Sequence, residues 1–342
     1  MNPVPPQTLE HLMNQQAITR RAGLALAGSA LIASSTGAWG QGSGTFPNRP
    51  IKIIVPSAPG GVADILTRLI APKMGERLGQ VVVVDYRAGA AGTIGLNATA
   101  RSAPDGYTLV FVSETHAAAE SLYAKRGYNI QKDLIPVAPI GNFAQVLVVN
   151  KNLPVTTLKE LIEYARANPD KLSYGSGGVG NTYHMAMELM NQMVGIKMQH
   201  VPYRSAGNAR TDLISGQIQL MFDTVGSMEQ HIQSGSVRAL AMSSAQRYER
   251  MPNVPTVAEA GVPGYLFESW CGLMGPAGIP ADIVARLGES VALAVQDKVI
   301  AAQFETNGVV PKRASPQEFG GWIKTSIDKL ALVIKTGDIK AD

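Results

Sequence analysis

Three glycine-rich turns contain the residues of this chain that could do chemistry, and that chemistry is the binding of a small anion. The turns run from Pro56 to Gly61, from Arg87 to Thr93 and from Gly175 to Thr182. Each follows a predicted strand and precedes a predicted helix. The first N–H groups of a helix lack intrahelical partners, and the helix dipole adds partial positive charge there. Such turns can therefore hold a carboxylate without a lysine or arginine.

Glycine also lets the backbone approach a ligand closely, and hydroxyl groups could add directed hydrogen bonds. In the first half of the chain, the predicted ligand-binding residues are Ser57, Pro59, Gly60, Gly61, Asp64, Thr93, Ser113 and His116. In the second half they are Ser176, Gly177, Gly180, Asn181, Thr182 and Asp223. Glycine-rich turns are also ordinary connections in α/β proteins, so this alternative stays open for each single turn.

Several of these side chains have a structural alternative. Asp64 could stabilise the dipole of its own helix, and Asp223 could cap the helix that follows it. His116 lies where a cleft is expected. His184, which follows the third turn, is expected to pack or cap within its helix rather than to act on a ligand.

Enzymatic function is the second class to weigh. Gly175, Gly177 and Gly180 match the motif G-x-G-x-x-G, which raises a nucleotide-cofactor-binding enzyme as the alternative. That motif needs an acidic residue near the end of the next strand, and the stretch 200–204 has none, although Arg204 could hold a 2′-phosphate. A hydrolase is disfavoured because no G-x-S-x-G occurs. The sequence therefore favours a binding protein that is not an enzyme and has no cofactor.

Composition excludes further classes. The 342 residues are 45% hydrophobic and 16% charged, with a formal net charge of +4. The single Cys271 allows neither an internal disulfide nor a cysteine-cluster metal site, and five histidines without H-E-x-x-H offer little for zinc. No basic stripe with interleaved aromatic residues occurs, so we expect no nucleic-acid partner and no metal.

The N-terminal residues predict an export signal. Arg20 and Arg21 precede an apolar run over 22–33, and Ala38 and Gly40 are small residues at the −3 and −1 positions of a cleavage site. The run is too short for a membrane-spanning helix. We predict a cleavable secretory signal peptide over residues 1–40. Twin-arginine export is a weaker alternative, and a buried N-terminal helix is the structural one.

Hydrophobic patterning predicts an α/β fold. Strands are expected at 51–55, 81–84 and 108–112, with helices at 63–78 and 93–101, which is typical of a parallel sheet covered on both faces. The alternation restarts after Asn150. The later expected strands are 172–174, 197–201, 219–222, 238–242 and 270–275, and the later expected helices are 157–168, 182–193, 206–215, 227–233, 281–296, 298–307 and 316–335.

Two α/β units in about 300 residues predict two lobes. Lobe 1 is expected to comprise 46–143 and 270–342, and lobe 2 to comprise 144–269. The runs 145–149 and 268–274 are expected to be two extended crossovers that form a hinge. Ligands favour the cleft between such lobes.

Many short motifs carry a family resemblance. They include Val55–Gly61 with Asp64 and Arg68, Ala103–Leu109, His200–Tyr203, Thr211–Leu213, Gly216–Gln217, Met221–Asp223 and Val254–Gly261. In their number and order, these stretches resemble the substrate-binding receptors of tripartite tricarboxylate transporters, also called Bug proteins. The resemblance covers the chain from Phe46 to the C-terminal helix.

The resemblance implies a type II-like, two-lobe periplasmic binding protein. Such a receptor closes around a small carboxylate, works as a monomer and delivers the ligand to integral-membrane permease subunits. In the family, turns matching 59–61 and 176–182 grip one ligand carboxylate, partly through ordered water. The chain departs from the family at Ser57, where phenylalanine is usual, and at Asn181, where a hydroxyl residue is usual. These departures leave the identity of the carboxylate open.

Overall fold

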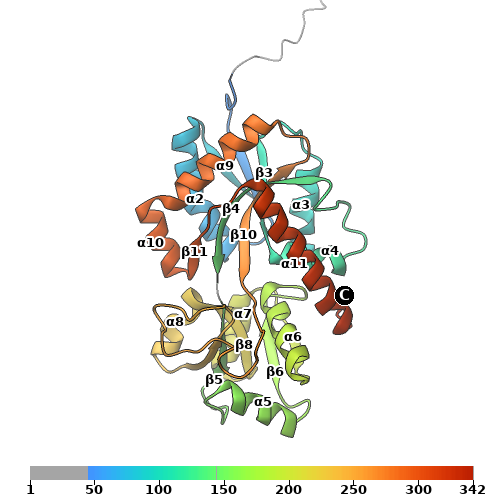
Figure 1. The fold of residues 1–342 in the computed structure, drawn as a ribbon, viewed down its shortest axis with the longest axis vertical. Helices are drawn as coiled ribbons and strands as arrows, with labels where there is room; N and C mark the ends of the chain where they lie inside the picture. Colours follow the sequence, from blue (N-terminus) through green and yellow to red (C-terminus); the bar gives the residue numbers. More distant parts are fainter. Residues whose placement is uncertain (1–44, 144, 342) are drawn as a thin grey trace, which may run out of the picture. The chain divides into compact units, whose positions relative to one another are not determined.

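The strands of the computed structural model, which describes residues 45–143 and 145–341, form two β-sheets flanked by helices (Figure 1). Residues 46–342 form one unit. The predicted signal peptide over 1–40 lies outside the described residues and stays a prediction. Within the described ranges, no helix is both long and apolar enough to cross a membrane.

The first sheet has six strands in the order β11-β4-β10-β3-β1-β2. Its strands are β1 (Ile51–Val55), β2 (Val82–Tyr86), β3 (Thr108–Ser113), β4 (Leu134–Phe143), β10 (Ser269–Pro276) and β11 (Val309–Pro311). The expectation of a parallel sheet holds for β1, β2 and β3. It is wrong for the other half of the sheet, because β10 runs antiparallel to both β3 and β4, and β11 runs antiparallel to β4.

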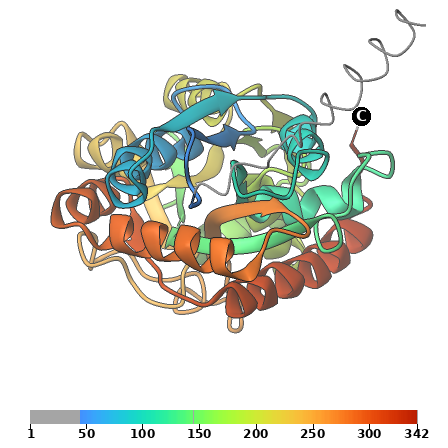
Figure 2. The same ribbon diagram turned by 90° about the horizontal axis from the view of Figure 1, so that it is seen from above.

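Helices cover both faces of this sheet because its strands are apolar on both sides. Along β3, Val110 and Val112 contribute to one hydrophobic cluster, and Leu109 and Phe111 to another. The first face is covered by α3 (Thr93–Ala100), α4 (Glu114–Leu122) and α11 (Pro316–Thr336). The second face is covered by α2 (Val62–Leu78), α9 (Ala281–Gln296) and α10 (Lys298–Thr306). Figure 2 shows α2 (blue) lying against α9 (orange).

The second sheet has five strands in the order β7-β6-β8-β5-β9. Its strands are β5 (Gln145–Asn150), β6 (Ser173–Ser176), β7 (Gln199–Pro202), β8 (Leu220–Thr224) and β9 (Val237–Met242). Its helices are α5 (Leu158–Ala167), α6 (Thr182–Val194), α7 (Ala206–Ser215) and α8 (Val225–Gln233). The run 145–149, which was predicted to be an extended crossover, follows β4 directly and forms β5, a buried inner strand between β8 and β9.

The two passages between the sheets are short and adjacent. The chain leaves β4 at Phe143 and enters β5 at Gln145. It returns through Phe267, whose N–H donates to the Ser243 carbonyl at 2.9 Å, into β10, where Ser269 pairs with Phe143. The second predicted crossover, 268–274, is thus mostly a strand of the first sheet.

Among the α-helices and strands of the described residues, α4, β4 and β11 were not predicted from the sequence. Pro136 and Pro139 argue against a strand, because proline cannot donate to the ladder. The structure accommodates them in β4, where the pairing with β10 shifts register twice. The polar start of α4 obscured that helix, which is capped by Ser113 and by the side chain of His116 in the place that glutamate usually takes.

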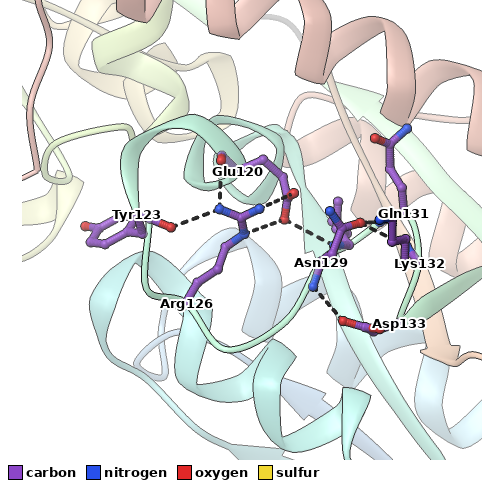
Figure 3. A network of polar contacts seen from close by, with 8 residues as sticks. Glu120, Tyr123, Arg126, Asn129, Gln131, Lys132 and Asp133 are labelled. Carbon is purple, nitrogen blue, oxygen red and sulfur yellow. Dashed lines mark hydrogen bonds and ion pairs between the residues drawn. The ribbon is translucent and has the colours of Figure 1, made fainter.

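Arg126 fixes the segment that leads from α4 to β4 (Figure 3). Its Nε and Nη2 donate to the two carboxylate oxygens of Glu120 at 2.8 and 2.7 Å, and its Nη1 donates to the carbonyls of Glu120 and Tyr123. The Ile130 N–H also donates to Glu120, at 3.1 Å. Because both charged side chains are largely buried, this bidentate pair holds the end of α4, including Leu122, in a defined place.

Candidate functional site

The first turn is shaped by Asp64. The Gly60 N–H donates to Asp64 Oδ2 at 2.7 Å, and the Tyr86 hydroxyl donates to Asp64 Oδ1 at 2.5 Å. That hydrogen bond raises the pKa of Tyr86. The structure thus gives Asp64 a turn-forming role, and the Gly60 amide is occupied. Among the described residues, the Gly61 N–H and the buried Ser57 hydroxyl have no hydrogen-bond partner, so both can serve a ligand.

The second turn meets the first at Gly92. Gly92 has φ +87°, and a Cβ there would overlap the His116 ring and lie 3.2 Å from Pro56 Cβ. Only glycine fits this position. The turn leads directly into α3 through the buried Thr93. The close approach brings together Pro56, the second turn and the start of α4, as the sequence predicted for one edge of a parallel sheet.

His116 acts as a helix cap in this structure. The Ser113 N–H donates to His116 Nδ1 at 2.9 Å, and the Ser113 hydroxyl lies 3.4 Å from the same nitrogen. Burial lowers the pKa of His116 to about 4, so the ring is neutral and carries its proton on Nε2. Capping of α4 therefore accounts for the main contacts of Ser113 and His116.

Side chains from β7 and α6 hold the third turn. The Ser176 hydroxyl donates to the Gly178 carbonyl at 3.0 Å, accepts from the Gly178 N–H at 3.1 Å and lies 2.7 Å from His200 Nε2. The Gly180 N–H donates to His184 Nδ1 at 3.1 Å. Among the described residues, the N–H groups of Gly177 and Val179 have no partner. These two amides, rather than the Ser176 hydroxyl, are free to meet an anion.

Asn181 and Thr182 start helix α6. Asn181 caps the helix, since its Oδ1 accepts from the Tyr183 N–H at 3.0 Å. The buried Thr182 hydroxyl lies 2.5 Å from Ser269 Oγ and accepts from Gln145 Nε2 at 3.0 Å. Ser269 and Gln145 are the first residues of the strands at the two passages between the sheets. Thr182 therefore links the third turn to the passages, a connection that the sequence could not indicate.

Asp223 forms an ion pair that the sequence reasoning missed. Arg210 donates to Asp223 Oδ2 from Nε and Nη2 at 2.9 and 2.8 Å, and the Thr224 N–H donates to Oδ1 at 2.7 Å. Burial raises the pKa of Asp223, and Arg210 opposes that rise. Neither role predicted for Asp223, the helix cap or the ligand contact, includes this ion pair with Arg210. Arg210 lies one turn into α7, and nothing in its spacing singled it out.

Gly180 of the third turn lies against the end of α4. A Cβ on Gly180 would overlap Leu122 Cδ1 at the end of α4, so the third turn lies directly against the first lobe. Gly175, the first glycine of the dinucleotide motif, is explained by packing rather than by a bound cofactor, because a Cβ there would clash with the side chains of Ile218 and Ala209. In the described part of the chain, no group of three or more His, Cys, Asp or Glu side chains could hold a metal ion.

Comparison with known proteins identifies relatives over most of the chain. Residues 66–339 match the family model described as tripartite tricarboxylate transporter family receptor. The protein BugT of Bordetella pertussis is 36% identical over 293 residues, which cover 85% of this chain and 90% of BugT. A protein encoded in the tcbD-tcbE intergenic region of a Pseudomonas species is 35% identical over 305 residues, covering 89% and 91% of the two chains.

Solved structures agree with these relatives. Rpa4515 of R. palustris, determined with adipate, has a TM-score of 0.80 at 34% identity, covering 86% of this chain and 99% of its own. MatC of Rhodopseudomonas palustris, with bound malate, has a TM-score of 0.77 at 30% identity, covering 84% and 100%. The periplasmic binding protein BugD has a TM-score of 0.78 at 30% identity, covering 87% and 100%. The two-lobe α/β fold predicted from the sequence is confirmed.

Proposed function

Because this chain belongs to the tripartite tricarboxylate transporter receptor family, we propose that it is a periplasmic receptor that captures a small dicarboxylate between its two lobes. The resemblance recognised in the sequence is thereby confirmed, and the nucleotide-cofactor alternative has no support. The observation that carries the proposal is the match to an adipate-bound structure over 86% of this chain. The family consists of solute-binding receptors, and we propose no catalytic step.

The proposed ligand site lies between the three turns. The amides of Gly61, Gly177 and Val179 have no hydrogen-bond partner among the described residues. Gly61 is the N-cap of α2, and Gly177 and Val179 lie in the turn that precedes α6. Partial positive charge at those helix starts favours a carboxylate. The Ser57 hydroxyl adds a directed donor. We assign Pro59, Gly60, Thr93, Asn181 and the remaining predicted residues to shaping this site rather than to donating to the ligand.

The lobes are proposed to comprise 46–143 with 270–342 and 144–269. The division of the strands between two sheets supports these bounds except at Ser269, which begins β10 of the first sheet. Closure would then bend the two short passages next to Phe143 and Ser269. The proposed partners are the integral-membrane permease subunits of a tripartite tricarboxylate transporter. Export through the signal peptide over 1–40 and a monomeric receptor without nucleic-acid contacts complete the proposal.

The first test is a thermal-shift screen. Saturating adipate or malate should raise the Tm by roughly 5 °C, because a ligand that binds only the folded state at about 100 times its Kd adds nearly 3 kcal/mol. Hexane-1,6-diol, which has the chain length of adipate but no carboxylate, is the matched control and should cause no shift. An equal shift with the diol, or none with any dicarboxylate in a library, would contradict the proposal.

Substitution of Ser57 tests the site itself. Ser57→Ala should weaken dicarboxylate binding by roughly tenfold, the effect of losing one hydrogen bond to a charged group. The Tm without ligand should not fall, because the Ser57 hydroxyl has no partner among the described residues. Ser102→Ala is the control, since that hydroxyl donates to the Thr99 carbonyl at the far end of α3. If calorimetry gives both variants the dicarboxylate affinity of the wild type, Ser57 does not contact the ligand.

A further inference from the structure

Two stacked imidazoles lie beneath the third turn. The rings of His184, on α6, and His200, on β7, are parallel within 6°, with centroids 3.7 Å apart. Tyr174 of β6 lies beside the pair, with its ring centroid 4.9 Å from that of His200 and 6.0 Å from that of His184, and its hydroxyl donates to Glu188. The ring pair and the tyrosine beside it therefore come from three secondary-structure elements, α6, β7 and β6.

Each ring holds a different part of the turn. His200 contacts Ser176 Oγ, which in turn bonds to both the N–H and the carbonyl of Gly178. His184 accepts the Gly180 N–H directly. Gly178 and Gly180 have φ angles of +117° and +75°, and neither has a side chain that could hold the turn. The two imidazoles hold the backbone of these glycines through hydrogen bonds, directly at Gly180 and through Ser176 at Gly178.

The hydrogen bonds define the proton positions on both rings. His184 Nδ1 accepts from Gly180, so the proton of the neutral ring is on Nε2. A serine hydroxyl has one proton and accepts two hydrogen bonds. Ser176 donates to the Gly178 carbonyl and accepts the Gly178 N–H, so its second acceptor position is filled when His200 donates from Nε2. We infer from these contacts that both rings are neutral Nε2–H tautomers.

We propose that His184 and His200 are positioning residues of the carboxylate site, which hold the third turn so that the Gly177 and Val179 amides face the ligand. This inference rests on the proposed function. Neutral rings suit this role, because two parallel imidazolium ions at this separation would repel each other and His184 would lose its acceptor. With both rings in place, the turn is already ordered before the carboxylate arrives, and less free energy is lost on binding.

The test pairs a disruptive and a conservative substitution at each position. His184→Leu removes the acceptor for Gly180, whereas His184→Asn keeps an oxygen near Nδ1. His200→Leu removes the contact to Ser176, whereas His200→Gln keeps an amide near Nε2. With adipate as the probe, calorimetry should show at least a tenfold loss of affinity in both leucine variants. The asparagine and glutamine variants should stay within about threefold of the wild type. His231→Leu on α8 is the control and should bind like the wild type.

Two measurements do not depend on a ligand. Hydrogen exchange at the Gly178 and Gly180 amides should accelerate at least tenfold in the leucine variants and not in His231→Leu. The ¹⁵N shifts of the wild-type rings should report Nε2–H tautomers at both histidines. An Nδ1–H tautomer at His184, or unchanged exchange together with unchanged affinity in the leucine variants, overturns the inference. Failure of the wild type to bind any dicarboxylate would instead overturn the proposed function, and exchange and tautomers would still decide the role of the histidines.

Discussion

The free energy of unfolding should fall by roughly 2 kcal/mol when the pH is lowered from 6 to 5, as the net of several linked protonations. Burial lowers the pKa of His116 to about 4, of His184 to about 3 and of His200 to about 4. Their pKa in the unfolded chain is near the ordinary 6.5. Between these values the unfolded chain binds protons that the folded protein does not, so stability is complete above pH 6.5 and is lost as the pH falls.

Glu114 opposes this trend. Its pKa is raised to about 7 by burial, so the folded protein holds a proton on Glu114 that the unfolded chain releases above pH 4.5. This proton stabilises the folded state at low pH. Between pH 5 and 6 its contribution offsets the loss in free energy of unfolding that about one of the three histidines causes. Urea unfolding at half-unit steps from pH 4.5 to 8 measures the balance. Stability that is constant or rises on acidification from pH 6 to 5 would show that the histidines are not buried as neutral rings.

Replacing Glu114 by glutamine should stabilise the protein at alkaline pH. Because the folded pKa of Glu114 is raised, its contribution is present below pH 4.5 and is lost as the pH rises through about 7. Above that pH the folded protein contains a buried carboxylate, which costs about 3 kcal/mol for a shift of this size. Glu114→Gln has the shape of the protonated acid and no charge, so it should be more stable than the wild type by about that amount at pH 8 and nearly equal to it at pH 5.

The groups around Glu114 do not fully compensate the negative charge of its ionised carboxylate. Its Oε1 accepts from Ser326 at 3.1 Å, and that hydroxyl also accepts from the indole of Trp270 at 2.7 Å. Its Oε2 has no partner among the described residues. Lys329 favours the charged form, and Glu268 disfavours it. Burial raises the pKa of Glu114 more than the positive charge of Lys329 lowers it.

A control variant distinguishes the effect of removing a buried carboxylate from the effect of removing an exposed one. Glu163 lies on the outer face of α5 with 62% of its side chain exposed, so Glu163→Gln should leave the pH dependence unchanged. Unfolding curves of both variants at pH 5, 6.5 and 8 give the comparison. If Glu114→Gln is no more stable than the wild type at pH 8, Glu114 is solvated rather than buried as a neutral acid.

Local sequence determined the chemistry of the turns. Gly92 and Gly180 have positive φ angles, which a tight turn requires and glycine allows, and the boundaries predicted for α7 and α9 agree with the structure to the residue. Such features depend on nearest neighbours and on the period of apolar residues, both of which are written along the chain. The family resemblance and the two-lobe α/β fold followed from the same local motifs. Those motifs also predicted which strand ends would carry glycine-rich turns.

Only the tertiary structure decided which polar groups remain free to bind a ligand. Ser57, Ser176 and Thr182 are all hydroxyl residues in glycine-rich turns, and the sequence treated them alike. The fold brings His200 to Ser176, and Ser269 and Gln145 to Thr182, from 24 to 87 residues away, and leaves Ser57 without a partner among the described residues. A hydrogen-bonding group is used up by whichever partner the fold places beside it, and that partner is not a neighbour in sequence.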